Sequence, residues 1–331
     1  MKEVVCTEYG LPDAFELKEV AMPEPKGNDV LVEVHATSVT THNLALVTGR
    51  PFFVRVMARA LRTPKIRTPG SDVAGVVAAV GGDAKLLREG DEVFGDLSLC
   101  GFGALAEYVC VPENTLTPKP RNITFREAAA VPQAAVAALQ GLRDKGRIQR
   151  GQSVLICGAS GGIGTFAVQI AKCLGAEVTA VCSAESAEMV RSLGADHVID
   201  YTKEDFTRNG RLYDLILGIA YRPIWDVRRA LGPHGTYVSV GAPSLKRILQ
   251  DMVLGRWLST EGGKRLVGGW MLTPNKDLGL ICGLIENGTV RPVVDRCFQF
   301  AEAASAFRYY AQGHSRGKVV ITVSAGDGNP R

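Results

Sequence analysis

The sequence carries little excess charge of either sign. Its 331 residues include 38 Lys and Arg and 34 Asp and Glu, which gives a formal net charge of +4 at pH 7 with His neutral. A balance this mild is not typical of proteins that bind nucleic acid or an anionic membrane surface. Apolar runs long enough to span a bilayer are also missing. We therefore expect neither nucleic acid nor membrane among the partners.

Closely spaced cysteines are absent too. The eight cysteines are scattered so that no two lie within four positions of each other, which excludes a zinc knuckle and a CxxC redox pair. Free thiols in this number are typical of a reducing compartment. The N-terminal residues Met1–Val5 have neither the apolar stretch of a signal peptide nor the character of a transit peptide. We expect a cytoplasmic protein.

One stretch, from Val154 to Gly164, has the pattern of a dinucleotide-binding turn. Val154–Cys157 predicts a buried strand, a glycine-rich turn follows, and apolar residues from Ile163 onward keep helical spacing as far as Gly175, which should end the helix. A strand, a tight turn and a helix N-terminus direct backbone N–H groups at one point. This arrangement binds a diphosphate.

The three glycine positions of the dinucleotide fingerprint are taken by Ala159, Gly161 and Gly164. Gly161 lets the backbone approach the phosphates, and Gly164 lets the helix pack closely. An ordinary glycine-rich turn is the alternative, but the strand before and the helix after favour cofactor binding. The predicted turn contacts are Ala159, Ser160, Gly161, Gly162, Ile163 and Gly164.

The predicted secondary structure changes in character twice along the chain. Strands predominate up to about residue 125, and Asp29–His35 alternates as a half-buried strand does. A helix over 127–142 should then begin or bend at Pro132, after which strands alternate with helices and require parallel crossovers. From Trp270 the pattern returns to that of the N-terminal, β-rich part. We predict that residues 126–268 form a nucleotide-binding domain inserted between residues 1–125 and 269–331 of a β-rich catalytic domain.

Six short motifs occur in a familiar order along nearly the whole chain. They are Pro69–Gly75, Gly90–Gly95, Ala106–Tyr108, Gly158–Gly164, Leu193–Asp196 and Gly317–Val320. Their order resembles the medium-chain dehydrogenase/reductase superfamily, in its zinc-free, ζ-crystallin-like quinone oxidoreductase branch. The resemblance implies an α/β fold in which a Rossmann doubly wound parallel sheet is inserted into a GroES-like catalytic domain. It also implies NADPH-linked reduction and a homodimer.

The zinc-free branch is indicated by missing ligands. Zinc-dependent relatives bind a catalytic zinc through a cysteine, the histidine of a Gly-His-Glu run, and a cysteine or histidine near the domain junction. The corresponding residues here are Thr40, Ser71 and Ala134 or a neighbour, and none can ligate zinc. The four-cysteine structural lobe of such relatives is reduced to Cys100 and Cys110. We predict no metal.

The choice between NADPH and NADH depends on the end of the second nucleotide-binding strand. An NAD-specific site places Asp or Glu there to bind the ribose 2′-hydroxyl, whereas this chain has Ser183, which can donate to a 2′-phosphate. By resemblance Tyr201 contacts the same phosphate. Relatives often carry Arg or Lys shortly after the serine, but this chain has Glu185, which either repels the phosphate or faces solvent. We predict NADPH rather than NADH.

Further cofactor contacts follow from the resemblance alone. Val240 and Gly241 end the strand beside the nicotinamide, and Trp270, Met271 and Leu272 lie on the returning crossover. Trp270 could equally be a core or interface aromatic.

Without a metal, interconversion of alcohol and ketone loses its Lewis acid. Hydride addition to an enone or a quinone instead develops an enolate-like oxygen that hydrogen bonds stabilise, so we predict reduction of such a small molecule. Thr40 and Asn43 stand where relatives place an Asn and an Asp that face nicotinamide and substrate. They are catalytic candidates, or they satisfy loop backbone only. The alternative functions are a zinc-free alcohol or aldehyde reductase and a non-catalytic NADPH-binding protein.

Overall fold

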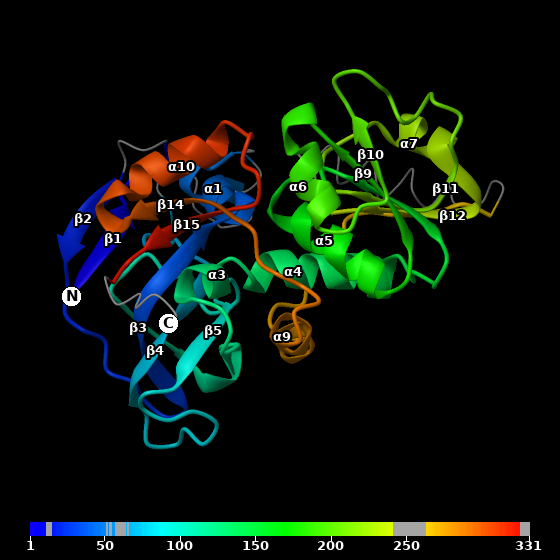
Figure 1. The fold of residues 1–331 in the computed structure, drawn as a ribbon. Helices are drawn as coiled ribbons and strands as arrows, with labels where there is room; N and C mark the ends of the chain where they lie inside the picture. Colours follow the sequence, from blue (N-terminus) through cyan, green and yellow to red (C-terminus); the bar gives the residue numbers. More distant parts are fainter. Residues whose placement is uncertain are drawn as a thin grey trace. The chain divides into compact units, whose positions relative to one another are not determined.

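The computed structural model describes residues 1–10, 15–50, 52, 55–56, 64, 66–240 and 263–324. The chain divides into two compact units (Figure 1). The first unit comprises Met1–Val136, Thr273–Gly288 and Pro292–Arg331, and the second comprises Ala137–Leu272 and Thr289–Arg291. The domain limits at residues 125 and 268 remain a sequence-based proposal.

The first unit is built on a seven-stranded sheet. Its strands follow the order β14-β15-β3-β4-β5-β7, and β6 pairs with β3 beside this path. Only β14 and β15 pair in parallel among the described strands of this sheet. The strands are β3 (Asp29–Val39), β4 (Asp72–Val80), β5 (Glu92–Asp96), β6 (Tyr108–Pro112), β7 (Leu116–Pro118), β14 (Val294–Gln299) and β15 (Lys318–Thr322), with β1 (Lys2–Cys6) and β2 (Phe15–Glu19) as a separate antiparallel pair.

Strand β3 runs through the middle of this sheet and differs from its prediction. Val30, Val32 and Val34 are fully buried, as their alternation predicts, but Leu31 is buried as well. The expected half-buried strand is therefore wrong, because helix α3 packs against it and both faces are covered. The strand also continues past His35 to Val39, so that the next residue, Thr40, lies where β3 ends and a helix begins.

The helices of the first unit begin at residues whose chemistry suits a helix start. Thr124 and Glu127 form a capping box at α3 (Phe125–Ala129), each side chain bonding the other's backbone N–H. Pro132 is the first residue of α4 (Pro132–Leu139), as predicted. The other helical segments here are α1 (Thr41–Thr48), α9 (Leu278–Glu286), α10 (Ala303–Ala311) and the 3₁₀ turns Glu113–Thr115 and Phe300–Glu302, and a π-helical turn (Gln140–Lys145) follows α4.

The second unit is a parallel α/β sheet. Its six strands follow the order β10-β9-β8-β11-β12-β13, and all of their pairings are parallel. This confirms the predicted doubly wound sheet, with its switch point between β8 and β11. The elements are β8 (Ser153–Cys157), α5 (Gly162–Cys173), β9 (Glu177–Cys182), a 3₁₀ turn (Ala184–Ser186), α6 (Ala187–Ser192), β10 (His197–Asp200), β11 (Tyr213–Gly218), α7 (Ile224–Ala230), β12 (Leu231–Ser239) and β13 (Arg265–Val267).

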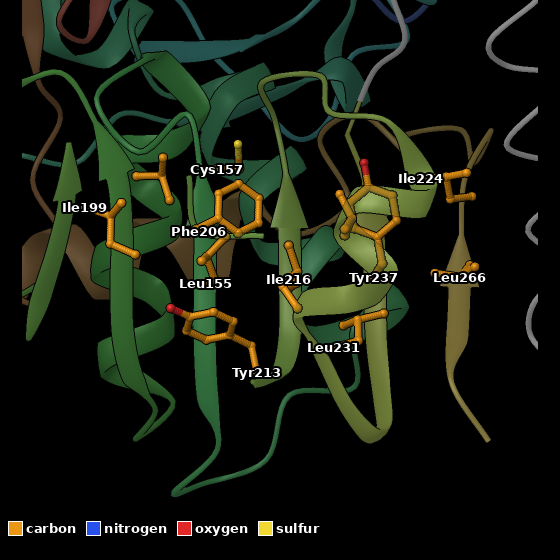
Figure 2. Packing of buried hydrophobic residues seen from close by; sticks show 13 residues of the cluster. Leu155, Cys157, Ile199, Phe206, Tyr213, Ile216, Ile224, Leu231, Tyr237 and Leu266 are labelled. Atoms are coloured by element: carbon orange, nitrogen blue, oxygen red, sulfur yellow. The ribbon is translucent and has the colours of Figure 1, made fainter. Parts of the chain in front are cut away.

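One face of this sheet is closed by a core cluster drawn from several strands and from the segment between β10 and β11. Figure 2 shows Leu155, Ile216 and Tyr237 on neighbouring strands, with the Phe206 ring next to Leu155 and Cys157. Gly218 makes room for the Tyr237 ring, because a Cβ there would lie 2.6 Å from its hydroxyl oxygen. The packing holds the carboxyl ends of β8, β9 and β11 in register.

Candidate functional site

The predicted dinucleotide turn leaves β8 through a left-handed residue. Gly158 has φ +89°, and a Cβ there would lie 3.0 Å from the backbone nitrogen of Ala220. The N–H groups of Gly158 and Ala159 both donate to the carbonyl oxygen of Val181, at 3.2 and 3.1 Å. Gly158 therefore makes the tight reversal, a role that the fingerprint did not assign to it. Ala159 is fully buried and offers only its backbone.

The helix that follows presents free backbone donors. Gly161 is the N-cap of α5, and the first helical hydrogen bond runs from Thr165 N–H to the Gly161 carbonyl at 3.0 Å. The N–H groups of Gly162, Ile163 and Gly164 precede that bond and have no carbonyl partner within the helix. A Cβ at Gly161 would meet only the Gly158 oxygen at 3.7 Å, whereas one at Gly164 would overlap that oxygen. These unpaired N–H groups and the open space at Gly161 are features that suit the binding of a diphosphate.

Two predicted contacts to the ribose phosphate lie side by side at the ends of β9 and β10. Cys182 pairs with Asp200, so Ser183 and Tyr201 follow at the same level of the sheet. The Tyr201 N–H donates to the Cys182 carbonyl at 3.2 Å, and its ring is 48% exposed. Glu185, in the 3₁₀ turn that follows β9 in the sequence, is exposed.

The second group of predicted cofactor contacts lies past the end of β12. Val240 N–H donates to the Gly218 carbonyl at 2.8 Å, and the Trp270 indole N–H donates to the Ser239 carbonyl at 2.9 Å. Trp270 thus anchors its own segment to the strand end. Met271 is 84% exposed and Leu272 is half-buried. Gly241 lies outside the described residues.

In the first unit, Thr40 and Asn43 are joined by a helix cap. Thr40 Oγ1 accepts a hydrogen bond from Asn43 N–H at 3.1 Å and so caps α1. Asn43 is fully buried, and its Oδ1 accepts from Ser71 Oγ at 3.4 Å. Its Nδ2 makes no hydrogen bond within the part of the chain that the structure describes. The pair therefore combines a structural cap with a spare buried amide donor.

Sequence reasoning missed the ionic network beside Ser71. Asp72 is fully buried, and its carboxylate accepts from Lys318 Nζ at 2.9 Å, from Ser38 Oγ at 2.5 Å and from Gln133 N–H at 3.0 Å. The network joins β3, β4 and β15 to the start of α4. An acidic residue at the start of an otherwise apolar strand was the available signal, because such a charge needs a partner when buried.

A second buried carboxyl lies across the strand pair from Asp72. Asp96 pairs with Asp72 in the register of β4 and β5, and its Oδ1 accepts from Ser98 N–H at 2.8 Å. Burial, and then the neighbouring charge of Asp72, raise the pKa of Asp96 to about 6. The first unit therefore holds two buried acids close to a single lysine.

The residues at the expected zinc positions do not fit a metal. Thr40 and Ser71 use their hydroxyl groups in hydrogen bonds, and Ala134 is buried. Across the described ranges, no group of three or more His, Cys, Asp and Glu side chains could hold a metal ion. Burial raises the pKa of the Cys157 thiol to about 11 despite the nearby Arg222.

Two family descriptions match the chain. The alcohol dehydrogenase GroES-like domain matches residues 26–121, and the zinc-binding dehydrogenase family matches residues 193–321. The first match confirms the GroES-like fold predicted for the β-rich part. The second matches within the nucleotide-binding part and the tail, and its description names a metal whose ligands we do not find among the described residues.

Whole-chain relatives agree with these matches. The chain is 35% identical to the mitochondrial NAD(P)H oxidoreductase RTN4IP1 of Mus musculus over 89% of its own length and 82% of that protein. It is 36% identical to the chloroplastic NADPH-dependent alkenal/one oxidoreductase of Arabidopsis thaliana, over 97% and 79%. The solved quinone oxidoreductase from Coxiella burnetii superposes with a TM-score of 0.87 at 27% identity, covering 98% and 99% of the two chains. The chain therefore belongs to the medium-chain dehydrogenase/reductase superfamily of nicotinamide-dependent oxidoreductases and, within it, to the quinone oxidoreductase branch.

Proposed function

We propose that this protein reduces a quinone or an α,β-unsaturated carbonyl with NADPH, and without a metal ion. The observation that carries the proposal is the hydrogen-bonded set Thr40, Asn43 and Ser71, which retains a buried amide donor. By resemblance, Thr40 and Ser71 take the positions of zinc ligands in zinc-dependent relatives. The names of two similar proteins, an alkenal/one oxidoreductase and a quinone oxidoreductase, supply the substrate class.

The second unit would hold the cofactor through backbone rather than side chains. The free N–H groups at the start of α5 take the diphosphate, and the positive end of the helix dipole supports its charge. We assign the nicotinamide end to Val240, Gly241, Trp270, Met271 and Leu272 by family resemblance. Bound there, the cofactor supplies a hydride.

The first unit would stabilise the charge that develops on the substrate oxygen. The Asn43 amide is held from two sides, because Ser71 donates to its Oδ1 and Thr40 caps its helix. Its Nδ2–H₂ is buried and has no hydrogen-bond partner among the described residues, and we assign it the role of donor to an enolate-like oxygen. A preorganised donor of this kind is worth about 10²–10³ in rate. Asn43 is the catalytic residue in this proposal, and Thr40 positions it.

The preference for NADPH depends on the ends of β9 and β10. Ser183 and Tyr201 offer hydroxyl donors to a 2′-phosphate, and β9 itself ends without the Asp or Glu that would bind a 2′-hydroxyl. The exposure of Glu185 supports the interpretation that it faces solvent.

A substrate screen tests the proposal. Purified protein is assayed for NADPH oxidation with quinones, acyclic enones, saturated ketones and aldehydes, before and after treatment with a chelator, and its metal content is measured. We expect turnover of quinones or enones that the chelator leaves unchanged. Turnover of saturated ketones and aldehydes alone would indicate an alcohol or aldehyde reductase. NADPH binding without turnover of any substrate would indicate a binding protein, and stoichiometric zinc would overturn the metal-free mechanism.

We also propose a homodimer and a cytoplasmic location. Sedimentation and cell fractionation test these two points, since several relatives carry the words mitochondrial or chloroplastic in their names. In the described parts of the chain, no helix is both long and apolar enough to cross a membrane.

A further inference from the structure

A 2′-phosphate needs a cation, and the expected position after Ser183 holds Glu185 instead. The end of the neighbouring strand β10 offers one, because Lys203 follows Tyr201 by two residues. Its side chain is 79% exposed, and its Nζ lies 3.9 Å from Asp200 Oδ2, which is too long for a hydrogen bond. The ammonium group is therefore loosely held near the end of β10, which carries Tyr201 and pairs with the end of β9 just before Ser183.

One oxygen of the Asp200 carboxylate is hydrogen-bonded to groups other than this lysine. Its Oδ1 accepts from the Thr202 hydroxyl at 2.8 Å and from Thr202 N–H at 3.0 Å. These two hydrogen bonds, with smaller contributions from Lys203 and the Ala184 N–H, lower the pKa of Asp200. Oδ1 therefore keeps both partners when Lys203 moves away, whereas Oδ2 has no hydrogen-bond partner among the described residues, with or without the lysine.

We propose that Lys203 is the residue that selects the 2′-phosphate, by moving from Asp200 to the phosphate monoester of the bound cofactor. This inference depends on the NADPH binding that we propose above. Ser183 on β9 and Tyr201 on β10 flank the phosphate as hydroxyl donors, and Lys203 supplies the charge that the chain lacks after Ser183. A dianionic phosphate is a stronger partner for an ammonium group than an exposed contact at 3.9 Å.

Another nearby cation is less suited to this role. Arg222, in the loop after β11, hydrogen-bonds the Cys157 thiol and also lowers the pKa of Asp205. Its guanidinium is thus engaged over β8 rather than at the ends of β9 and β10. Lys203, whose 3.9 Å contact with Asp200 is not a hydrogen bond, is easier to redirect than Arg222.

The test measures dissociation constants by calorimetry for NADPH, NADH, 2′-phospho-ADP-ribose and ADP-ribose. We expect Lys203→Gln to weaken NADPH and 2′-phospho-ADP-ribose about tenfold, which corresponds to about 1.4 kcal/mol, and to change NADH and ADP-ribose by less than twofold. Lys203→Arg should keep most of the preference. Lys26→Gln, at another exposed lysine, serves as the matched control and should change none of the four constants.

Two results would overturn the inference. In one, Lys203→Gln weakens phosphorylated and unphosphorylated ligands equally. In the other, it changes none of them while Arg222→Gln removes the preference. Failure of the proposed function gives a different result, because the unmodified protein would then bind none of the four ligands or would prefer NADH.

Discussion

The two units carry proposed functional groups of different kinds. In the second unit the contacts that we propose for the cofactor diphosphate are backbone N–H groups of consecutive residues, set by glycines at 158, 161 and 164. In the first unit the catalytic group that we propose is one buried side chain, Asn43, whose amide oxygen is bonded by Ser71, 28 positions away. A backbone site depends on the absence of side chains, whereas a side-chain site depends on partners, and the two should therefore fail differently.

The largest effect should come from filling the backbone site. A methyl group at Gly164 would overlap the Gly158 carbonyl, so we expect Gly164→Ala to weaken NADPH binding at least a hundredfold by displacing the turn. Calorimetry measures the binding, and circular dichroism checks that the variant folds. Gly283→Ala is the matched control, because Gly283 lies in helix α9 with open space around its Cβ position. It should leave binding unchanged and stability equal or higher. Normal binding by Gly164→Ala would show that the close approach is not required.

The second-largest effect should come from breaking the buried ion pair between Lys318 and Asp72. Lys318→Met leaves the fully buried Asp72 without its charged partner, and removing one member of such a pair costs about 3–5 kcal/mol in the free energy of unfolding. Urea unfolding measures the loss. Lys172→Met, which breaks the exposed pair with Asp196, should cost less than about 1 kcal/mol. Similar losses in the free energy of unfolding for both variants would contradict the expectation that the buried pair contributes more than the exposed one.

Removal of the amide donor should affect rate rather than binding. We expect Asn43→Ala to lower kcat about 10²-fold while the dissociation constant of NADPH stays within twofold, since the cofactor diphosphate is held by the other unit. Steady-state kinetics with an enone and calorimetry with NADPH separate the two quantities. Thr40→Ser keeps the helix cap and serves as the control, with activity close to that of the unmodified protein. If Asn43→Ala keeps full turnover, the amide is not the catalytic donor.

The smallest effect should be a dependence of stability on pH. The pKa of Asp96 is raised by burial to about 6 in the folded protein, from an ordinary value near 3.8. Between these values the native state retains a proton that the unfolded state has lost, so this carboxyl makes the free energy of unfolding fall as the pH rises from about 4 to 6. Thermal unfolding of Asp96→Asn across this range measures the difference. The variant should gain stability relative to the unmodified protein as the pH rises, and parallel curves would contradict the assignment.

Local patterns were sufficient to predict the elements of the cofactor site. The run from Val154 to Gly164 predicted a strand, a turn and a helix, and these appear as β8 and α5. Gly175 has φ +82° just past the end of α5, as its predicted role requires. Such features follow from sequence because glycine, proline and apolar spacing act over a few neighbouring residues.

The sequence by itself thus determined the elements of the nucleotide-binding unit, and motifs in family order pointed to the superfamily. Only the tertiary structure showed that Asn43 meets Ser71 and that Asp72 meets Lys318 across 246 positions. It also showed that the end of β10, near which Lys203 contacts Asp200, pairs with the end of β9 before Ser183. The reason is physical. Hydrogen bonds and ion pairs between distant residues depend on strand register and on burial from both sides, and neither is encoded in the spacing of any one segment.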